Sequence, residues 1–536
     1  MTLISKLILR LSQSKNKYFQ KDEKLLTFLI LFDMMADRRE RNMNKIGFDN
    51  EKYLKIQSKH IKERIESFGG KLYLEFGGKL FDDYHASRVL PGFAPDSKIR
   101  MLKELKDQTE IVIAIKAGDI EKNKVRGDLG ITYDEDVLRL IDAFTSNGLM
   151  VGSVVLTQFK DQPSAIAYEK KLKSLGLQVY RHYMIPGYPS NMQLILSDDG
   201  YGKNDYIKTT RSLVVVTAPG PGSGKMATCL SQLYQEAKRG VKAGYAKFET
   251  FPIWNIPLNH SVNLAYEAAT ADLNDVNMID PYHLEAYGKT VVNYNRDVEI
   301  FPVLKAMFEK INGTSPYNSP TDMGVNMAGY CIFDDEAVTK AANQEIIRRY
   351  YDAVDEERKG NASHKPVGKI ELLMEKAHTS IADRPVVAAA NVKEEETGGP
   401  AAAIEMPDGT IITGKTSELL GASSAMLIDA LKYLAHVNDD IKLISPDIIE
   451  PIQKLKVETL QNKNPLLHID EILIALCIAA THHEEAKRAY GKLKELAGLQ
   501  MHSSVLLAQE DVNVLKKLGI HLTCEPKYQN NKLYHH

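Results

Sequence analysis

The feature that most constrains the fold is a regular alternation of short apolar runs and amphipathic segments between residues 71 and 250. The apolar runs are rich in Val, Ile and aromatic residues, as expected of strands buried on both faces of a parallel sheet. The segments between them carry apolar residues at helical spacing and stop on glycine, as in YDEDVLRLIDAFTSNG. The alternation predicts an α/β fold with a doubly wound, mainly parallel sheet and helices on both faces. The runs expected as strands are KLYLEFGG, EIVIAIKAG, LMVGSVVLTQF, LQVYRHYMI, SLVVVTAP and VKAGYAKFETF.

The chain has 536 residues, too many for one hydrophobic core, and we divide it into four regions. Residues 1–42 are basic, lack glycine and precede a second possible start at Met43, so we interpret them as a non-native leader or disordered extension, with an amphipathic helix as the alternative. We predict a P-loop-like α/β domain over residues 43–295 and a mainly helical region over 296–382. Residues 383–536 are predicted to form a smaller C-terminal α/β domain.

The C-terminal region begins with a pattern typical of a hairpin followed by helices. AAAIEMPDGTIITGK is expected to turn on Asp408-Gly409, because that dipeptide suits a tight hairpin loop. The preceding PVVAAANVK is expected as a strand, and the following SELLGASSAMLIDALKYLAHV as a helix.

Charge and cysteine usage exclude several classes of function. A formal net charge of −2 provides no broad positive field, so bulk nucleic-acid binding is not expected. The four cysteines are far apart and form no CxxC pair, so neither zinc nor a disulfide framework is expected. The apolar run LLTFLILFDMM is too short to span a bilayer. We therefore expect a cytoplasmic protein without a membrane partner.

The segment LVVVTAPGPGSGK leads from a predicted strand into a predicted helix and has the features of a phosphate-binding loop. Such a loop needs glycines whose backbone N–H groups line one concavity at a helix N-terminus, and a lysine for the outer phosphates. Here Gly220, Gly222, Ser223 and Gly224 would supply the backbone, and Lys225 the charge. The alternative is a turn that binds nothing, but three glycines and a lysine at a helix start are costly unless used.

The loop departs from the pattern G-x-x-x-x-G-K-[ST] at two positions. Pro219 replaces the first glycine, and Met226 replaces the Ser or Thr that binds magnesium in that pattern. The nearest hydroxyl, that of Thr228, is turned by about 200° around the helix from Met226. Thr228 is therefore a candidate binding residue, but a poor substitute for the missing magnesium ligand. The metal ligands stay unknown, and magnesium would be held by carboxylates, water or the phosphates.

Two further Gly-Lys pairs follow predicted strands. Each alone is typical of an ordinary turn, but together they raise the chance that one of them helps the main loop to bind an anion. The residues are Gly77, Gly78 and Lys79 in one pair, and Gly414, Lys415 and Thr416 in the other.

Acidic and basic residues after the loop are candidates for the chemistry itself. Lys247 and Glu249 are two apart near the end of a predicted strand, so they share one face, and we predict catalytic roles for both. A partly solvated strand end is the alternative. Asp272, Asp275 and Asp280 could bind magnesium, although an Asn/Asp-rich segment is more often turn chemistry.

From Met43 onward the chain resembles the bacterial family described as domain of unknown function 1846. The resemblance is carried by KLYLEFGGKLFDDYHASRVLPG, GKNDYIKTTRSLVVVTAPGPGSGK, AGYAKFETFPIWN and EAATADLNDVNMIDPYHLEAYG. It implies a phosphotransferase-like protein with three Gly-Lys motifs, at Lys79, Lys225 and Lys415, but no established reaction.

The leading hypothesis is an ATP- or GTP-dependent phosphotransferase or ligase that acts with magnesium on a small molecule. Lys225 would neutralise the charge that develops on the transferred group. One alternative is a non-catalytic sensor or binding protein for a phosphorylated metabolite. Another is a dinucleotide-dependent oxidoreductase, although the glycines form G-x-G-x-G and not G-x-G-x-x-G. The nucleotide base and the acceptor are not determined by the sequence, and a homo-oligomer stays open.

Overall fold

The computed structural model describes residues 46–529, apart from residues 79, 82, 127, 128 and 274. The predicted leader 1–42 and Lys79 therefore lie outside the described residues. Residues 46–384 form one compact unit, the N-terminal unit, and residues 385–536 belong to a second, the C-terminal unit.

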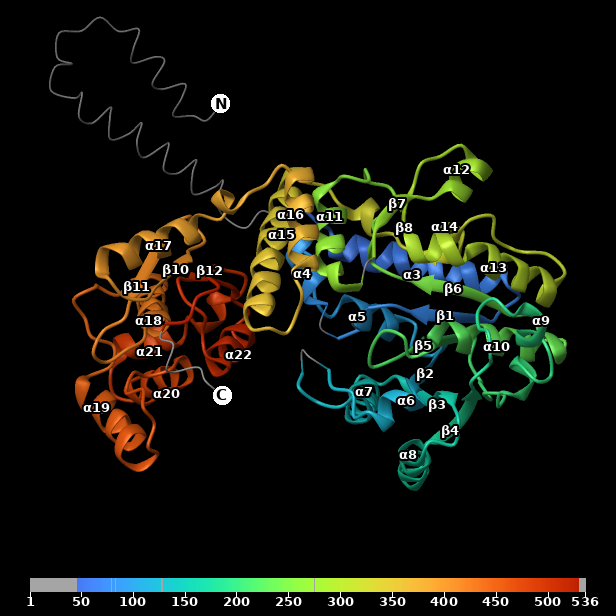
Figure 1. Ribbon diagram of the computed structural model, residues 1–536, viewed down its shortest axis with the longest axis horizontal. Coiled ribbons are helices and arrows are strands. Elements are labelled where there is room, and N and C mark those ends of the chain that lie inside the picture. Colours follow the sequence, from blue (N-terminus) through green and yellow to red (C-terminus); the bar gives the residue numbers. More distant parts are fainter. Residues whose placement is uncertain (1–45, 79, 82, 127–128, 274, 530–536) are drawn as a thin grey trace, which may run out of the picture. The chain divides into compact units, whose positions relative to one another are not determined.

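The N-terminal unit is built on a seven-stranded sheet in which every neighbouring pair of strands is parallel (Figure 1). The strand order is β4-β3-β2-β5-β1-β6-β9. The predicted α/β fold with a mainly parallel sheet is thereby confirmed, and each run expected as a strand contains one. The strands are β1 Leu72–Phe76, β2 Thr109–Lys116, β3 Met150–Phe159, β4 Gln178–Tyr183, β5 Leu213–Thr217, β6 Gly244–Phe248 and β9 Gly324–Val325.

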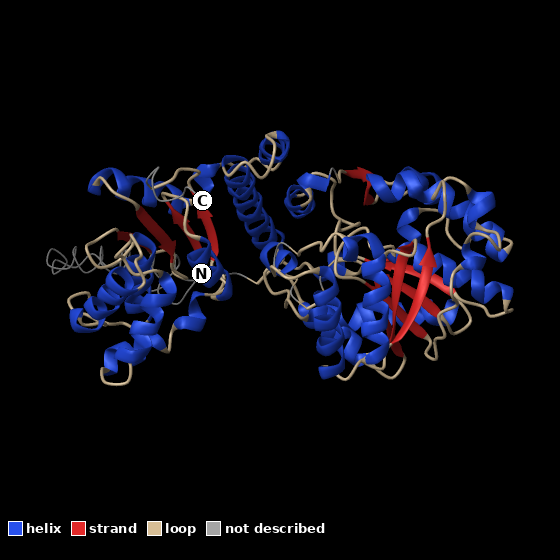
Figure 2. Ribbon diagram, turned by 60° about the horizontal axis from the view of Figure 1, so that its bottom comes forward, coloured by secondary structure: helices blue, strands red, loops and turns tan. Residues whose placement is uncertain are grey.

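Helices cover both faces of this sheet, and the direction of the crossovers explains why (Figure 2). The chain moves from β2 to its neighbour β3 in one direction, but from β5 past β1 to β6 in the other. Parallel crossovers are right-handed, so α7 (Tyr133–Ser146) and α10 (Lys225–Lys238) lie on opposite faces. The loops after β2 and β5 therefore diverge, which makes the carboxyl edge between these two strands a topological switch point, the usual place for a ligand in such sheets.

The sheet core is continuous with the helix that follows the glycine-rich loop. Val214 and Val216 of β5 pack in one apolar cluster with Cys229 and Leu230 of α10. The same cluster contains Phe301 of α13 (Asn295–Asn312), so α13 packs on the same core as α10. The loop is thus attached to a rigid strand and a rigid helix.

The helices between residues 296 and 382 belong to the same compact unit as the large sheet. None of the helices in the described ranges is long and apolar enough to cross a membrane. The remaining helices of this unit are α3 Asn50–Ser67, α4 Tyr84–Val89, α5 Ser97–Glu104, α6 Ala117–Glu121, α8 Pro163–Ser174, α9 Met192–Ile195, α11 Ser261–Ala269, α12 Pro281–Tyr287, α14 Pro320–Met323, α15 Asp335–Arg358 and α16 Lys365–Lys376, with a small hairpin of β7 Asn277–Ile279 and β8 Val292–Tyr294.

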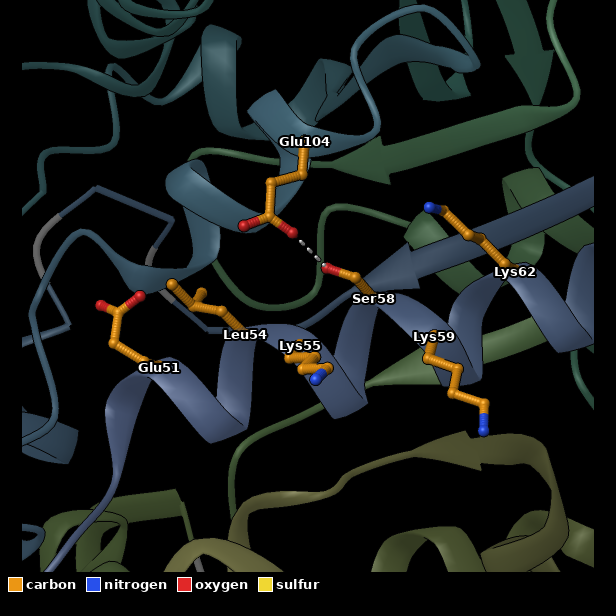
Figure 3. A pocket seen from close by; sticks show the side chains of 7 residues that line it. All are labelled: Glu51, Leu54, Lys55, Ser58, Lys59, Lys62 and Glu104. Atoms are coloured by element: carbon orange, nitrogen blue, oxygen red, sulfur yellow. Dashed lines mark hydrogen bonds between the residues drawn. The ribbon is translucent and has the colours of Figure 1, made fainter.

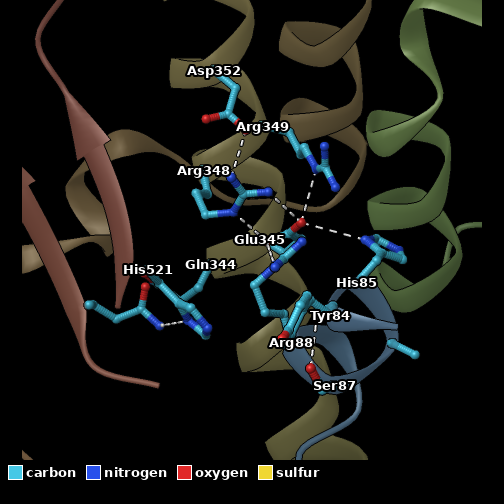
Figure 4. A network of polar contacts seen from close by, with 12 residues as sticks. Tyr84, His85, Ser87, Arg88, Gln344, Glu345, Arg348, Arg349, Asp352 and His521 are labelled. Carbon is cyan, nitrogen blue, oxygen red and sulfur yellow. Dashed lines mark hydrogen bonds and ion pairs between the residues drawn. The ribbon is translucent and has the colours of Figure 1, made fainter. Parts of the chain in front are cut away.

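A buried ion network ties α4 to α15 within the N-terminal unit (Figure 4). Glu345 has a side chain that is only 1% exposed, and it accepts from Arg88 at 2.8 Å, Arg348 at 2.7 Å and Arg349 at 2.9 Å. Burial alone would raise the pKa of Glu345, but the three guanidinium groups hold it well below the usual range. Because α4 directly follows the segment after β1, the network anchors that segment.

The C-terminal unit has its own sheet, in the order β11-β10-β12-β13. The predicted hairpin is present as β10 (Ala401–Glu405) and β11 (Ile411–Lys415), which pair antiparallel around Gly409 at φ 84°. The sheet packs on a core shared with α18 (Ala422–Leu434). The other elements are β12 Gln500–Ser503, β13 His521–Cys524, α19 Pro446–Lys454, α20 Ile469–Ala479, α21 Glu484–Tyr490 and α22 Gln509–Lys517.

One predicted strand is wrong. PVVAAANVK lies in helix α17 (Pro385–Thr397), which starts on a proline that suits the first helical turn. Val386, Val387 and Ala390 are its buried residues, and their spacing fits one helical face. The paired valines suggested a strand. The helix is favoured by the three alanines, which are the best helix formers, and by packing against Ala403.

Candidate functional site

The GPGSGK segment forms a preorganised cradle of backbone N–H groups at the start of α10. Gly222 and Gly224 have φ of 73° and 88°, in the left-handed region that favours glycine, and Gly224 is the N-cap. The N–H groups of Gly222 to Ala227 make no hydrogen bond to any residue that the structure describes. Unpaired amides at a helix N-terminus, reinforced by the helix dipole, form an anion site.

Neighbouring elements hold this loop in place. Thr157 of β3 donates through Oγ1 to the carbonyl of Ser223 at 2.7 Å, and Ser223 Oγ donates to the carbonyl of Gly220 at 2.9 Å. A Cβ atom at Gly220 would lie 2.2 Å from the hydroxyl oxygen of Tyr133. The loop therefore leans across the switch point towards β2 and β3, and Gly220 is required by close packing, not by its own backbone angles.

Met226, which replaces the usual hydroxyl residue, and Thr228, the nearest hydroxyl, both pack into the core. Met226 is partly buried and packs against the apolar cluster of β5 and α10. Thr228 is fully buried, and its Oγ1 has no hydrogen-bond partner within the described residues. Neither side chain supplies an exposed oxygen to the cradle, so the assignment of Thr228 to ligand binding stays a prediction.

Lys225 has the freedom expected of a ligand-binding lysine. It makes no hydrogen bond or ion pair with the described residues. Burial raises the pKa of the Cys229 thiol, Glu75 raises it further, and Lys225 opposes both. Lys225 and Glu75 therefore both act electrostatically on this thiol.

The strands β1 and β6 bring the next group of residues to the same edge. Glu75 pairs in register with Val216 of β5 on one side and with Lys247 of β6 on the other. Glu75 accepts from the Tyr245 hydroxyl at 2.7 Å. The N–H of Gly77 donates to the carbonyl of Phe248 at 2.8 Å, and a Cβ atom at Gly77 would lie 2.8 Å from Cγ of Glu249. The Gly77-Gly78 turn and the Lys247–Glu249 strand end, both predicted from the sequence, are thus in contact.

Lys247 is the centre of a buried cluster of charges. Its Nζ donates to Asp297 Oδ1 and Oδ2 at 2.8 and 2.7 Å, contacts the Tyr294 hydroxyl, and lies 3.1 Å from Glu249 Oε1. Burial alone would lower the pKa of the Lys247 ammonium, but the carboxylates of Asp297, Glu249 and Glu75 raise it far above its usual value. Lys247 is therefore held as an ammonium ion between these carboxylates, and its predicted catalytic role stays a prediction.

Glu249 is the titratable group of this cluster. Burial raises the pKa of its carboxyl to about 7, with Lys247 opposing the rise and Asp297 adding to it. Tyr294 donates to Glu249 Oε1 at 2.9 Å, and 26% of the Glu249 side chain stays exposed. A reachable carboxyl that titrates near neutrality is suited to general acid–base catalysis.

A second buried cation beside the Gly-Gly turn was missed by sequence reasoning. Lys98 of α5 is 2% exposed, pairs with Asp83 at 2.7 Å, and has its Nζ 3.1 Å from where a Cβ atom of Gly78 would lie. Lys98 shares a helical face with Leu102 and Leu105, and a lysine on an apolar face was the available signal.

The remaining sequence candidates do not form a metal centre. Asp280 caps α12, accepting from the N–H groups of Tyr282 and His283, both at 3.0 Å. Asp275 forms an ion pair with Arg296 at 2.7 Å. No group of three or more potential metal ligands occurs among the described residues.

The third Gly-Lys pair belongs to the C-terminal unit. Gly414 serves packing, because a Cβ atom there would lie 2.3 Å from the backbone nitrogen of Met426 in α18. Lys415 is exposed, and Thr416 lines a small cavity at the start of α18.

A cavity of about 490 Å³ lies elsewhere in the N-terminal unit (Figure 3). Its walls come from α3 and from Glu104 of α5, and Ser58 donates to Glu104 at 3.1 Å. The cavity is open and its lysines are surface residues of one helix. None of its residues belongs to a loop at the carboxyl ends of the strands, so its size alone does not make it the functional site.

Two family models together match most of the chain. The model described as "Domain of unknown function DUF1846, N-terminal" matches residues 46–378, and the corresponding C-terminal model matches residues 382–534. UPF0371 protein cu0538 of Corynebacterium urealyticum is 59% identical over 490 residues, which cover 91% of this chain and 99% of that protein. UPF0371 proteins of Streptococcus sanguinis and Streptococcus pneumoniae are 59% and 58% identical over 492 residues, 92% of this chain and 100% of each relative. Their names state no activity.

Proposed function

The chain belongs to the DUF1846 family, and from the geometry of its N-terminal unit we propose that it binds a nucleoside triphosphate and transfers a phosphoryl group to a small molecule. The observation that carries the proposal is the position of two complementary groups on one sheet edge. The unpaired amides before α10 form an anion cradle, and Glu249, with a pKa of about 7, ends a nearby strand.

The spacing of the strands supports this arrangement. β5 carries the cradle and β6 carries Glu249, with β1 between them. Two strand spacings correspond to about 10 Å. That distance leaves room for the outer phosphates and an acceptor between the cradle and the carboxylate. Glu75 and the Gly77 turn form the floor between them.

In the proposed reaction each residue has a separate task. The N–H groups of Gly222 to Ala227 bind the phosphates, and Lys225 stabilises the charge that builds up as the terminal phosphoryl group leaves. Glu249 accepts the proton of the acceptor hydroxyl, whose oxygen attacks phosphorus while the bond to the bridging oxygen breaks. Lys247, fixed by Asp297, orients the Glu249 carboxylate.

Magnesium would enter with the nucleotide in this proposal. The described residues contain no group of three or more potential metal ligands, and Met226 occupies the position of the usual hydroxyl ligand. The phosphates and water would therefore supply most of the coordination.

A phosphometabolite sensor is the second candidate, and the packing of Met226 into the core favours it because the cradle offers no direct metal ligand. The dinucleotide alternative fits less well. In a dinucleotide fold the strand after the glycine-rich helix lies next to the strand that carries the loop. Here β1 separates β5 from β6, so Glu249 is one strand too far away to serve as the ribose-binding acid.

The test is calorimetric titration of the full chain with ATP, ADP and GTP, with and without magnesium. Lys225→Ala should abolish the binding, and Lys238→Ala, at the opposite end of the same helix, should leave it intact. A search for phosphate transfer from the bound nucleotide to pooled metabolites follows, with Glu249→Gln as the inactive variant. Equal nucleotide affinity of the two lysine variants would exclude the cradle, and binding without any phosphate transfer or release would favour the sensor.

A further inference from the structure

A second candidate site lies in the C-terminal unit, at the N-terminus of α18, and the proposed function does not use it. A cavity of about 70 Å³ opens there, which we call the α18 pocket. Its lining includes Thr416, Gly421 to Ser424, His468 and Asp511. At roughly 10–15 Å³ of probe-occupied volume for each water, the space accommodates a group of about five heavy atoms.

The strongest sign of a ligand is the hydroxyl of Ser423. This side chain is 5% exposed and lines the pocket, and its Oγ has no hydrogen-bond partner among the described residues. The next residue shows the contrast, because Ser424 Oγ donates to the carbonyl of Leu467 at 3.0 Å. A buried hydroxyl without a partner is unfavourable. The hydroxyl of Ser423 is therefore explained best by a ligand in the cavity.

The backbone at the same point is also unpaired. Gly421, the N-cap of α18, has no side chain to accept from the first helical turn. The N–H groups of Ala422, Ser423 and Ser424 make no hydrogen bond to residues that the structure describes. The dipole of a 13-residue helix adds to the attraction for a negative group. Three amides and one hydroxyl thus serve the same cavity.

The neighbouring helix start shows what such amides bind in this unit. At α20 the Asp511 carboxylate accepts from the N–H of Ile469 at 2.7 Å, so the protein supplies its own anion there. The second oxygen of Asp511 contacts His468 Nδ1 at 3.1 Å. This hydrogen bond raises the pKa of His468, which favours the protonated form of the ring beside the Asp511 carboxylate.

We propose that the α18 pocket binds the phosphate group of a small ligand, held by the N–H groups of Ala422, Ser423 and Ser424 and by the Ser423 hydroxyl. A phosphate fits the volume, and its oxygens match the donors in number. Lys415 is exposed and is not part of the lining, so the third Gly-Lys motif reaches this pocket only through Thr416.

The decisive variant is Gly421→Asp, which places a carboxylate where the ligand phosphate would bind. A Cβ atom at Gly421 would have only the carbonyl of Leu467 within reach, at 3.9 Å, and φ of −68° with ψ of 158° suits an aspartate N-cap. Without phosphate the variant should melt at about the same temperature as its parent or up to about 1 °C higher, since an aspartate N-cap is only a few tenths of a kcal/mol better than a glycine one. Inorganic phosphate should no longer stabilise it.

All measurements use the full chain carrying Lys225→Ala, so that the loop before α10 does not contribute. Ser423→Ala should weaken binding of inorganic phosphate about tenfold, the effect of one hydrogen bond to a charged group, without lowering the melting temperature. Ser445→Ala is the matched control, because Ser445, the N-cap of α19, lies outside the pocket lining and its loss should leave the phosphate affinity unchanged.

Comparison of probes identifies the source of the phosphate. Tighter binding of ribose 5-phosphate than of inorganic phosphate would assign the pocket to a phosphate ester, and the reverse to the free ion; both support the proposal. Unchanged phosphate affinity in Ser423→Ala, or a phosphate response that survives Gly421→Asp, overturns it. Equal stabilisation by acetate at the same ionic strength also overturns it, because the pocket would then be a carboxylate site. A failed result here leaves nucleotide binding at Lys225 untouched, since that is measured in the parent chain.

Discussion

Replacement of Glu249 by glutamine should make the protein more stable at alkaline pH while abolishing its chemistry. Glutamine keeps the oxygen that accepts from Tyr294 and lies beside Lys247, at 2.9 and 3.1 Å, but it cannot ionise. The native protein bears the cost of holding an ionised carboxylate in a mostly buried position, and the variant does not. A residue kept at such a cost is expected to serve function, as stability is exchanged for activity.

The size of the effect follows from the pKa of this carboxyl. The usual value is 4.5, and burial raises it to about 7 in the folded protein. Between these pH values the folded state holds more protons than the unfolded state, so stability falls as the pH rises and stays low above 7. At about 1.4 kcal/mol per pH unit the full difference is about 3.4 kcal/mol. Since 26% of the side chain is exposed, we expect about 1–3 kcal/mol.

The assay is thermal unfolding of wild type and Glu249→Gln from pH 5 to pH 8.5 at constant ionic strength. The two melting curves should coincide near pH 5 and separate by several degrees at pH 8, with the variant higher. Glu285→Gln, which removes an exposed carboxylate on α12, controls for the change in net charge. Parallel curves for wild type and Glu249→Gln, or a variant less stable at pH 8, would refute the argument that Glu249 is buried at a cost.

Four further substitutions, at three positions, test other parts of the N-terminal unit. Lys225→Ala should change the free energy of unfolding by less than about 0.5 kcal/mol but abolish nucleotide binding measured by calorimetry. Lys225→Arg should also lose nucleotide binding, because a planar guanidinium does not fit a compact cradle. Normal nucleotide affinity in both variants would contradict the proposal. Met226→Thr should lower the free energy of unfolding in urea by about 1–3 kcal/mol, because its hydroxyl enters a packed apolar cluster. Tighter magnesium-dependent binding of nucleotide at unchanged stability would contradict the packing argument. Glu345→Gln should be the most damaging, at about 3–5 kcal/mol, because it leaves three arginines around a site without its counter-charge; an unchanged melting temperature would show that these charges rearrange freely.

Local patterns predicted the elements of this fold well. The strand runs were apolar on both faces, and the hairpin at Asp408-Gly409 carried its turn chemistry in its sequence. The failure at PVVAAANVK is instructive, because two valines outweighed three alanines in the interpretation, although helix propensity and the spacing of buried residues agreed on a helix.

The site was only partly accessible to the same reasoning. The glycine-rich loop, Lys247 and Glu249 were recognised because each carries a local signal. Asp297 and Tyr294, which fix Lys247, come from about 50 residues further along, in segments without a motif. Their proximity depends on how α13 packs against the sheet, and no periodicity in a single sequence reports that packing.

The place of β1 in the sheet also affects how the chain can be synthesised. This strand comes first among the seven, yet both of its neighbours, β5 and β6, are made at residues 213–217 and 244–248. On the ribosome, the apolar segment Leu72–Phe76 must therefore wait for more than a hundred residues to emerge before it can pair. Such non-local pairing slows folding and leaves an apolar, aggregation-prone strand exposed. Chains released before Phe248 should consequently aggregate or require a chaperone, whereas longer nascent chains should become protease-resistant in one step.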